Sequence, residues 1–163
     1  MKRLVAIVGP TAAGKSALAL RLAQQLAGAV IVSADSRQVY RGMDIGTAKP
    51  NRDDLARVPH RLIDVVEPHQ PFSLADYQRL AYAAIDAAQR PLLVGGTGLY
   101  VRALVDGLVL PEAPPDPELR AQDCSAAELR DRLRELDPVG AEAIDPANRY
   151  RLLRAVERLS LIH

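Results

Sequence analysis

The sequence predicts an α/β fold, with a parallel sheet and helices on both faces, followed by a small helical appendage. Three observations predict it. Short apolar runs alternate with helical patterns through the first part of the chain, as strands and crossover helices do in parallel sheets. A Gly-containing loop joins the first apolar run directly to a helical pattern. After Gly107 the composition changes, and the remaining chain carries helical patterns alone.

The first predicted elements form a strand–helix–strand unit. Residues 4–8 are an apolar run, which we interpret as the first strand. In residues 16–26 leucines recur every four positions, so one face of the predicted helix is apolar. Residues 30–33 are a second short apolar run bounded by turn residues, and we expect a second parallel strand there.

Residues 35–70 have weak periodicity and several turn signals, so we expect long functional loops with one short helix near 53–58. Four polar side chains in this region are interpreted as structural. They are His60 and His69, in hydrogen-bonded loops, and Asp44 and Asp64, at turns or helix caps. Asp44 could also help to shape a substrate pocket.

The next helix begins at Ser73, where Ser73 and Asp76 form a capping box. Residues 91–94 form the third predicted strand, which ends in a Gly-Gly-Thr-Gly turn. A helix of about two turns follows at 99–105.

We expect a domain boundary at residue 110, between a core of residues 1–110 and a helical domain of residues 111–163. Proline-rich residues 111–117 look like a linker. Three helices are predicted beyond it, beginning at Ser125 with a capping box, after Asp137-Pro138, and after Asp145-Pro146. The sequence stops inside the last predicted helix, and we therefore expect a truncated domain.

Bulk composition restricts the class of protein. Hydrophobic residues make up 48% of the 163 residues, aromatics only 4%, and Trp is absent, so the core must be aliphatic. No apolar stretch approaches the roughly 20 residues of a bilayer span, and the chain enters its first strand without a signal peptide. The lone Cys124 suits a reducing cytoplasm, and the three histidines lack metal-ligand spacing.

The loop after the first strand is a complete phosphate-binding motif. Its residues are Gly9, Pro10, Thr11, Ala12, Ala13, Gly14, Lys15 and Ser16. Glycines let backbone N–H groups wrap around phosphate oxygens, and the positive end of the following helix faces the same anion. Lys15 adds a mobile charge, and the Ser16 hydroxyl can hold Mg²⁺. The motif predicts binding of a di- or triphosphate.

Asp35 follows the second predicted strand, at the sheet edge where ligands bind in open α/β folds. Its position allows three roles: a Mg²⁺ ligand, a general base acting on an acceptor, or the N-cap of the next segment. The residue alone does not decide between them.

The surrounding blocks do carry a resemblance. Residues 9–16 and 35–50, with Pro59 to Asp64, Phe72 to Tyr77 and Pro91 to Tyr100, closely resemble the bacterial tRNA dimethylallyltransferases, also called tRNA isopentenyltransferases. The likeness continues through residues 116–120, Asp137-Pro138 and residues 148–157. It covers nearly the whole chain in the family's order, and it implies a P-loop kinase-like core.

This resemblance implies transfer of a dimethylallyl group from dimethylallyl diphosphate to N6 of the adenine adjoining the tRNA anticodon. The phosphate loop would hold the pyrophosphate with Mg²⁺ on Ser16, and Lys15 would neutralise the leaving group. Asp35 would be the general base, Thr11 would bind the donor phosphate, and Thr97 would lie near the adenine. The adenine must turn out of its stack.

The same match implies contacts with the anticodon stem-loop. Asp35, Ser36, Arg37 and Gln38 correspond to a tRNA-contacting segment, as do Arg120, Arg151 and Arg154. Arg151, Arg154 and Arg158 lie on one face of the last predicted helix. Without the resemblance, we would interpret this face as a solvated surface. We expect a monomer.

The chain departs from the family pattern between Arg120 and Glu128 and at its end, and family members are longer. We therefore expect weak pyrophosphate binding and little or no transfer by this chain alone. Two alternatives stay open: a P-loop small-molecule or nucleotide kinase, in which Asp35 serves an acceptor hydroxyl, and a non-catalytic RNA-binding protein.

Overall fold

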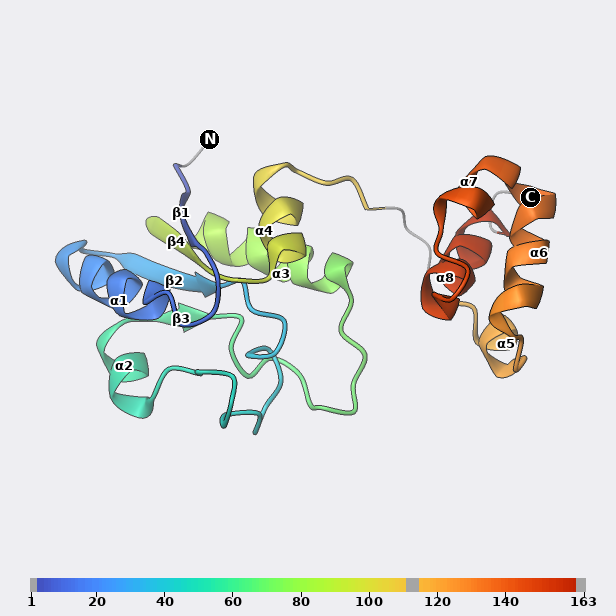
Figure 1. Ribbon diagram of the computed structural model, residues 1–163. Helices are drawn as coiled ribbons and strands as arrows, with labels where there is room; N and C mark the ends of the chain where they lie inside the picture. Colours follow the sequence, from blue (N-terminus) through green and yellow to red (C-terminus); the bar gives the residue numbers. More distant parts are fainter. Residues whose placement is uncertain (1–2, 111–114, 161–163) are drawn as a thin grey trace. The chain divides into compact units, whose positions relative to one another are not determined.

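A computed structural model describes residues 3–110 and 115–160 (Figure 1). The chain divides into two compact units, Met1–Val109 and Leu110–His163. Each unit has its own apolar core, and each is described by itself.

The first unit is built on a four-stranded sheet in which every strand pair is parallel. The strand order is β1 (Val5–Val8), β4 (Arg90–Gly95), β2 (Ala29–Ser33), β3 (His60–Arg61). The expected parallel α/β sheet is confirmed. We expected His60 in a loop, and that prediction was wrong, because His60 pairs with Ile31 in the two-residue strand β3. A strand of two residues is too short to show a periodic pattern.

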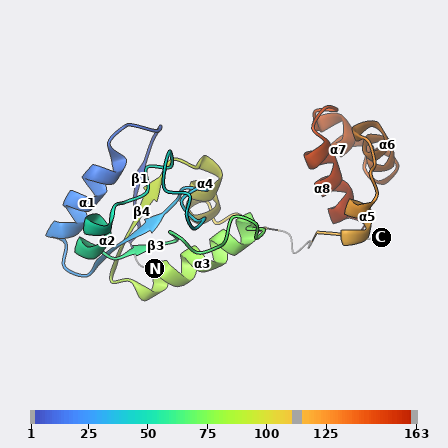
Figure 2. The same cartoon turned by 90° about the horizontal axis from the view of Figure 1, so that it is seen from below.

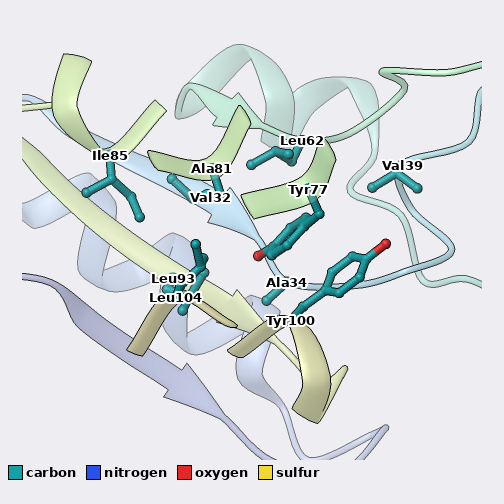
Figure 3. Close-up of a cluster of buried hydrophobic side chains, with 10 residues drawn as sticks. All are labelled: Val32, Ala34, Val39, Leu62, Tyr77, Ala81, Ile85, Leu93, Tyr100 and Leu104. Carbon is teal, nitrogen blue, oxygen red and sulfur yellow. The ribbon is translucent and has the colours of Figure 1, made fainter. Parts of the chain in front are cut away.

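Helices cover both faces of this sheet, as predicted (Figures 1 and 2). Alternate strand residues point to opposite faces, so Val32 and Leu93 enter one core while Ile31 and Leu92 enter the other. The first core packs against α3 (Leu74–Ala87) and α4 (Gly98–Val105), as Figure 3 shows. The second packs against α1 (Lys15–Gln25). Helix α2 (Arg52–Arg57) is the short helix expected near residues 53–58.

Two tyrosines supply the aromatic part of the first core. The rings of Tyr77 and Tyr100 stack with their centroids 3.7 Å apart (Figure 3). The Tyr77 hydroxyl donates to the Ser33 carbonyl oxygen at 3.2 Å, which ties α3 to the end of β2. Burial raises the pKa of Tyr77, and burial with the nearby charge of Tyr40 and Asp35 raises the pKa of Tyr100 to about 12. Both hydroxyls are therefore neutral at physiological pH.

The second unit is helical, with α5 (Pro117–Ala121), α6 (Ala126–Leu136), α7 (Pro138–Ala143) and α8 (Arg149–Leu159). Its core consists of leucines, alanines and a valine from these helices. The capping boxes predicted at Ser73 and Ser125 are both present.

Two predicted boundaries in this unit were wrong. Pro117 begins α5 instead of ending a linker, because the Asp116 carboxylate caps the N–H groups of Glu118 and Leu119. The rest of that predicted linker, residues 111–114, lies outside the described residues. The last helix begins at Arg149 under an Asn148 cap, whereas we expected it to begin directly after Asp145.

Candidate functional site

The carboxyl ends of three strands meet at one edge of the sheet. Val8 of β1 lies beside Gly95 of β4, and Val94 lies beside Ser33 of β2. The phosphate loop, Asp35 and the Gly-Gly-Thr-Gly turn leave from these three ends. Gly95 lies so close to Ala34 that a Cβ would overlap the Ala34 carbonyl group. Only glycine therefore permits these two strand ends to approach.

The phosphate loop leads directly into α1, and its backbone is shaped for that passage. Gly14 is the N-cap, in the left-handed region at φ 78°, where glycine meets no steric penalty. Ala12 has φ 64°, a conformation that costs a non-glycine residue about 1 kcal/mol or more. Helix α1 begins without a side-chain cap and without an acidic residue in its first turn. The first N–H groups of α1 and its positive dipole end are therefore available to an anion.

Lys15 lies over this loop. Its ammonium donates to the Pro10 carbonyl oxygen at 2.5 Å. A Cβ on Gly96 would lie 3.8 Å from the Lys15 Nζ and 3.2 Å from the Gly9 carbonyl oxygen, so the turn after β4 approaches the phosphate loop closely.

A cavity of about 310 Å³ lies at this edge of the sheet. Seven of its lining residues were predicted as site residues, and they are Thr11, Ala12, Gly14, Lys15, Ser16, Asp35 and Gln38. The other lining residues were not predicted, and they are Ala17, Ala19, Ile31, Ser33, Thr47, Ala48, Pro50, His60, Ile63, Val94, Gly95 and Gly96. Gly9, Pro10 and Ala13 belong to the loop but do not line the cavity. The missed residues are mainly small or apolar, and most of them lie in the residue blocks that carry the family resemblance, which is the signal that could have found them.

Asp35 takes one of the three roles that the sequence left open, that of a cap. Its Oδ1 atom accepts from the N–H groups of Arg37 at 2.8 Å and Gln38 at 3.3 Å, so the carboxylate caps the following turn. The same side chain lines the cavity beside the phosphate loop. Capping through one oxygen holds the carboxylate in place and leaves its second oxygen for other chemistry.

Thr97 and Ser36 do not line the cavity but bridge two of the strand ends. The Thr97 hydroxyl oxygen accepts from the Ser36 N–H at 3.0 Å and lies 3.3 Å from the Ser36 hydroxyl. The Thr97 N–H donates to the Ala34 carbonyl at 3.1 Å. Arg37 is exposed beside them.

Gln38 is buried and joins three segments. Its amide oxygen accepts from the Ser33 hydroxyl at 3.0 Å, and its amide nitrogen donates to the carbonyls of Thr47 at 3.0 Å and Ala48 at 3.2 Å. It therefore fixes the cavity wall as well as lining it.

His60 also lies in the cavity wall, half-buried, with its Nδ1 2.8 Å from the Val58 carbonyl oxygen. Burial lowers the pKa of His60 despite this hydrogen bond and the charge of Asp54.

Asp44 and Asp64 have a role that the sequence did not reveal. Both carboxylates contact the buried Lys49 ammonium, each at 2.6 Å. Burial alone would lower the pKa of Lys49, but the bonds and charges of the two carboxylates outweigh it and raise that pKa.

In the second unit, two of the three predicted RNA-contacting arginines meet a fully buried carboxylate. Glu157 accepts from Arg120 Nε at 2.7 Å, from Arg154 Nη1, and from the Asp116 N–H at 3.1 Å. Burial opposes ionisation, but these donors outweigh it and lower the pKa of Glu157. Arg151 is exposed on α8.

Within residues 3–110 and 115–160 no three His, Cys, Asp or Glu side chains gather in a group that could hold a metal ion. No helix in the same two stretches is long and apolar enough to cross a membrane. Ser16 and Asp35 nevertheless place a hydroxyl and a carboxylate in one cavity. Such oxygens suit Mg²⁺, which usually takes one or two protein ligands together with substrate phosphates and water.

Two family models match this chain, and together they cover the residues of the cavity and those of the second unit. The family model described as "IPP transferase" matches residues 38–161, and that described as "Isopentenyl transferase" matches residues 2–65. The chain belongs to the IPP transferase family. The match includes residues from both units and, with the second model, the phosphate loop.

Two curated relatives are named tRNA dimethylallyltransferase. The chain is 56% identical over 164 residues to the tRNA dimethylallyltransferase of Roseiflexus sp. (strain RS-1), covering 94% of this chain and 53% of that protein. It is 52% identical over 167 residues to the tRNA dimethylallyltransferase of Chloroflexus aggregans, covering 96% of this chain and 56% of that protein. The chain thus spans about half the length of these relatives.

Solved structures support the fold. The full-length tRNA isopentenylpyrophosphate transferase of Bacillus halodurans is 46% identical, with a TM-score of 0.65 over 99% of this chain and 56% of that one. A eukaryotic dimethylallyltransferase acting on tRNA is 23% identical, with a TM-score of 0.79 over 99% of this chain and 44% of that one. The second likeness shows the fold alone. The P-loop kinase-like core is therefore confirmed.

Proposed function

We propose that the phosphate-loop cavity binds dimethylallyl diphosphate with Mg²⁺, and that the protein transfers its dimethylallyl group to N6 of the adenine adjoining the anticodon in tRNA. One observation carries this proposal: an uncapped helix N-terminus, Lys15 and the Asp35 carboxylate share one cavity. The names of the relatives, which are tRNA dimethylallyltransferases, supply the substrate class.

The donor's two ends match two kinds of lining. The free N–H groups of α1 and the Lys15 ammonium would bind the diphosphate, and Thr11 would donate a further hydrogen bond. Mg²⁺ held by Ser16 would supply charge stabilisation to the leaving pyrophosphate. Ile31, Ala48, Pro50, Ile63 and Val94 give the cavity the apolar lining that a five-carbon group requires.

The transfer breaks the allylic C–O bond and forms a bond from that carbon to the adenine N6. Pyrophosphate leaves, and N6 loses one proton. The Asp35 carboxylate would accept this proton, because its position is fixed by the turn that it caps. Thr97, bonded to Ser36, would lie near the adenine.

The acceptor RNA would contact polar groups of both units, all of them exposed or half-buried except Gln38, which is buried. Ser36, Arg37 and Gln38 adjoin Asp35 in the first unit. Arg120, Arg151 and Arg154 lie in the second, where the first and last share the Glu157 carboxylate. We propose residues 1–110 as the catalytic core and residues 111–163 as an RNA-contacting helical domain, in a monomeric, cytoplasmic protein.

Donor choice separates this function from a kinase, because a kinase of the same fold requires ATP. Calorimetric titration of the chain with dimethylallyl diphosphate, pyrophosphate and ATP, each with Mg²⁺, tests it. We expect the first two to bind more tightly than ATP and Lys15→Ala to weaken both by tenfold or more. Arg21→Ala, an exposed position on α1, is the control and should change neither. Preference for ATP would contradict the proposal.

A further inference from the structure

The Lys49 ammonium is fully occupied inside the first unit. It donates to the Tyr40 carbonyl oxygen at 2.9 Å and to the carboxylates of Asp44 and Asp64 at 2.6 Å each. An ammonium has three N–H donors, and these three acceptors use them all. The Lys49 side chain is only 5% exposed, and it does not line the cavity. Lys49 is therefore placed to hold protein segments together, and no donor is left for a phosphate.

The segments that Lys49 holds form one side of the cavity. Residues 43–50, here called the wall loop, include a turn at residues 45–48 and contain no strand or helix. Thr47, Ala48 and Pro50 of the wall loop line the cavity. Ala48 and Pro50 are the two neighbours of Lys49 in the chain, and Ile63, also in the lining, is the neighbour of Asp64. Both residues of the Lys49–Asp64 ion pair are therefore adjacent in the chain to apolar residues that line the cavity.

Further hydrogen bonds join the same segments. The Asp64 N–H donates to the Gln38 carbonyl at 3.1 Å, and the Gln38 side chain donates to the Thr47 and Ala48 carbonyls. Asp64 adopts φ 54°, a left-handed conformation that is uncommon for non-glycine residues but is adopted more readily by Asp than by most of them. Lys49 bonds to the same segments through Tyr40, Asp44 and Asp64. Asp44 and Asp64 raise the pKa of its ammonium although burial acts against the charge.

We propose that Lys49 is a positioning residue for the five-carbon group of the donor: it fixes Ala48, Pro50 and Ile63 as the apolar side of the cavity without touching the ligand. This inference rests on the proposed function. The phosphate end of the cavity is built by β1 and α1, to which Lys49 makes no bond. Loss of Lys49 should therefore affect the apolar part of the donor and spare the diphosphate.

The variant Lys49→Met keeps an unbranched side chain that is one atom shorter, and it removes the charge. Asp44 and Asp64 are 66% and 40% exposed, so both carboxylates can hydrate and the unit should still fold. We expect affinity for dimethylallyl diphosphate to fall about tenfold while affinity for pyrophosphate changes less than about twofold. Asp44→Asn removes one exposed partner and should give a smaller change in the same ratio. The matched control is Arg102→Met, which removes a cation from an exposed ion pair with Asp106 and should leave both affinities unchanged.

Calorimetry measures the ratio of the affinities for dimethylallyl diphosphate and pyrophosphate. Hydrogen exchange at the Asp64 amide measures how firmly the segment of Asp64 is held. We expect that amide to exchange about tenfold faster in Lys49→Met, with α1 amides unchanged. Equal loss of both affinities, or loss of neither, would overturn the inference, as would unchanged exchange at Asp64. Failure of the wild-type chain to bind either ligand would overturn the proposed function, and the exchange result would then show separately whether Lys49 holds the segment of Asp64 in place.

Discussion

Replacing Glu157 by Gln should destabilise the second unit far more than replacing an exposed glutamate with similar partners. The Glu157 side chain is 0% exposed and accepts from Arg120, Arg154 and the Asp116 N–H. Glutamine replaces one carboxylate oxygen by an NH2 group, which faces guanidinium donors and cannot accept their hydrogen bonds.

The magnitude follows from this geometry. Breaking a buried ion pair by removing one partner costs about 3–5 kcal/mol. Arg120 and Arg154 are 39% and 26% exposed and can regain water, so the lower end, about 3 kcal/mol, applies. A helical unit of this size has on the order of 5 kcal/mol of stability. Glu157→Gln should therefore remove more than half of it.

Hydrogen exchange followed by mass spectrometry measures this loss helix by helix. Protection of α6 and α8 should fall about 100-fold, since 1.4 kcal/mol corresponds to a factor of ten, while α1 keeps its protection. Glu142→Gln is the control: Glu142 also contacts two arginines, Arg130 and Arg134, but is 62% exposed, and its replacement should leave protection unchanged. A change of less than about fivefold in Glu157→Gln would show that the buried carboxylate does not stabilise this unit as calculated.

Three further outcomes are expected. Gly95→Ala should prevent β4 from reaching Ala34 and lower the melting temperature of the first unit by at least about 5 °C. Gly98→Ala is the control and should leave the melting temperature unchanged, because a Cβ added there meets nothing within 4 Å. Equal melting temperatures for the two variants would contradict the close approach of β4 to Ala34. Asp35→Ala should cost about 1–2 kcal/mol in denaturant unfolding because two amides lose their acceptor, and Asp35→Asn should restore most of it; no difference between the two would argue against the cap. The pKa of His60 is lowered in the folded state, so the unfolded chain binds more protons below about pH 6.5. The free energy of unfolding should therefore fall as the pH drops through the pKa of His60 in the folded state. A His60→Gln variant whose free energy of unfolding depends on pH as steeply as that of the wild type would contradict this.

The parts predicted correctly from the sequence depend on local chemistry. The phosphate loop, the capping boxes at Ser73 and Ser125, and the buried strand β2 each have a residue pattern that determines a local structure. The wall loop has no such pattern, because its position comes from contacts between residues far apart in the chain. Lys49 meets Asp64 across 15 residues, and Arg120 meets Glu157 across 37.

If the proposed function holds, the phosphate loop and the wall loop bind opposite ends of one prenyl diphosphate. The most direct test is titration of the isotopically labelled chain with Mg²⁺ and either dimethylallyl diphosphate or pyrophosphate, observing backbone amide NMR shifts. We expect both ligands to shift the amides of Gly14, Lys15 and Ser16, and only dimethylallyl diphosphate to shift those of Ala48 and Ile63. Shifts confined to residues away from the cavity, or identical shifts with both ligands, would contradict the claim.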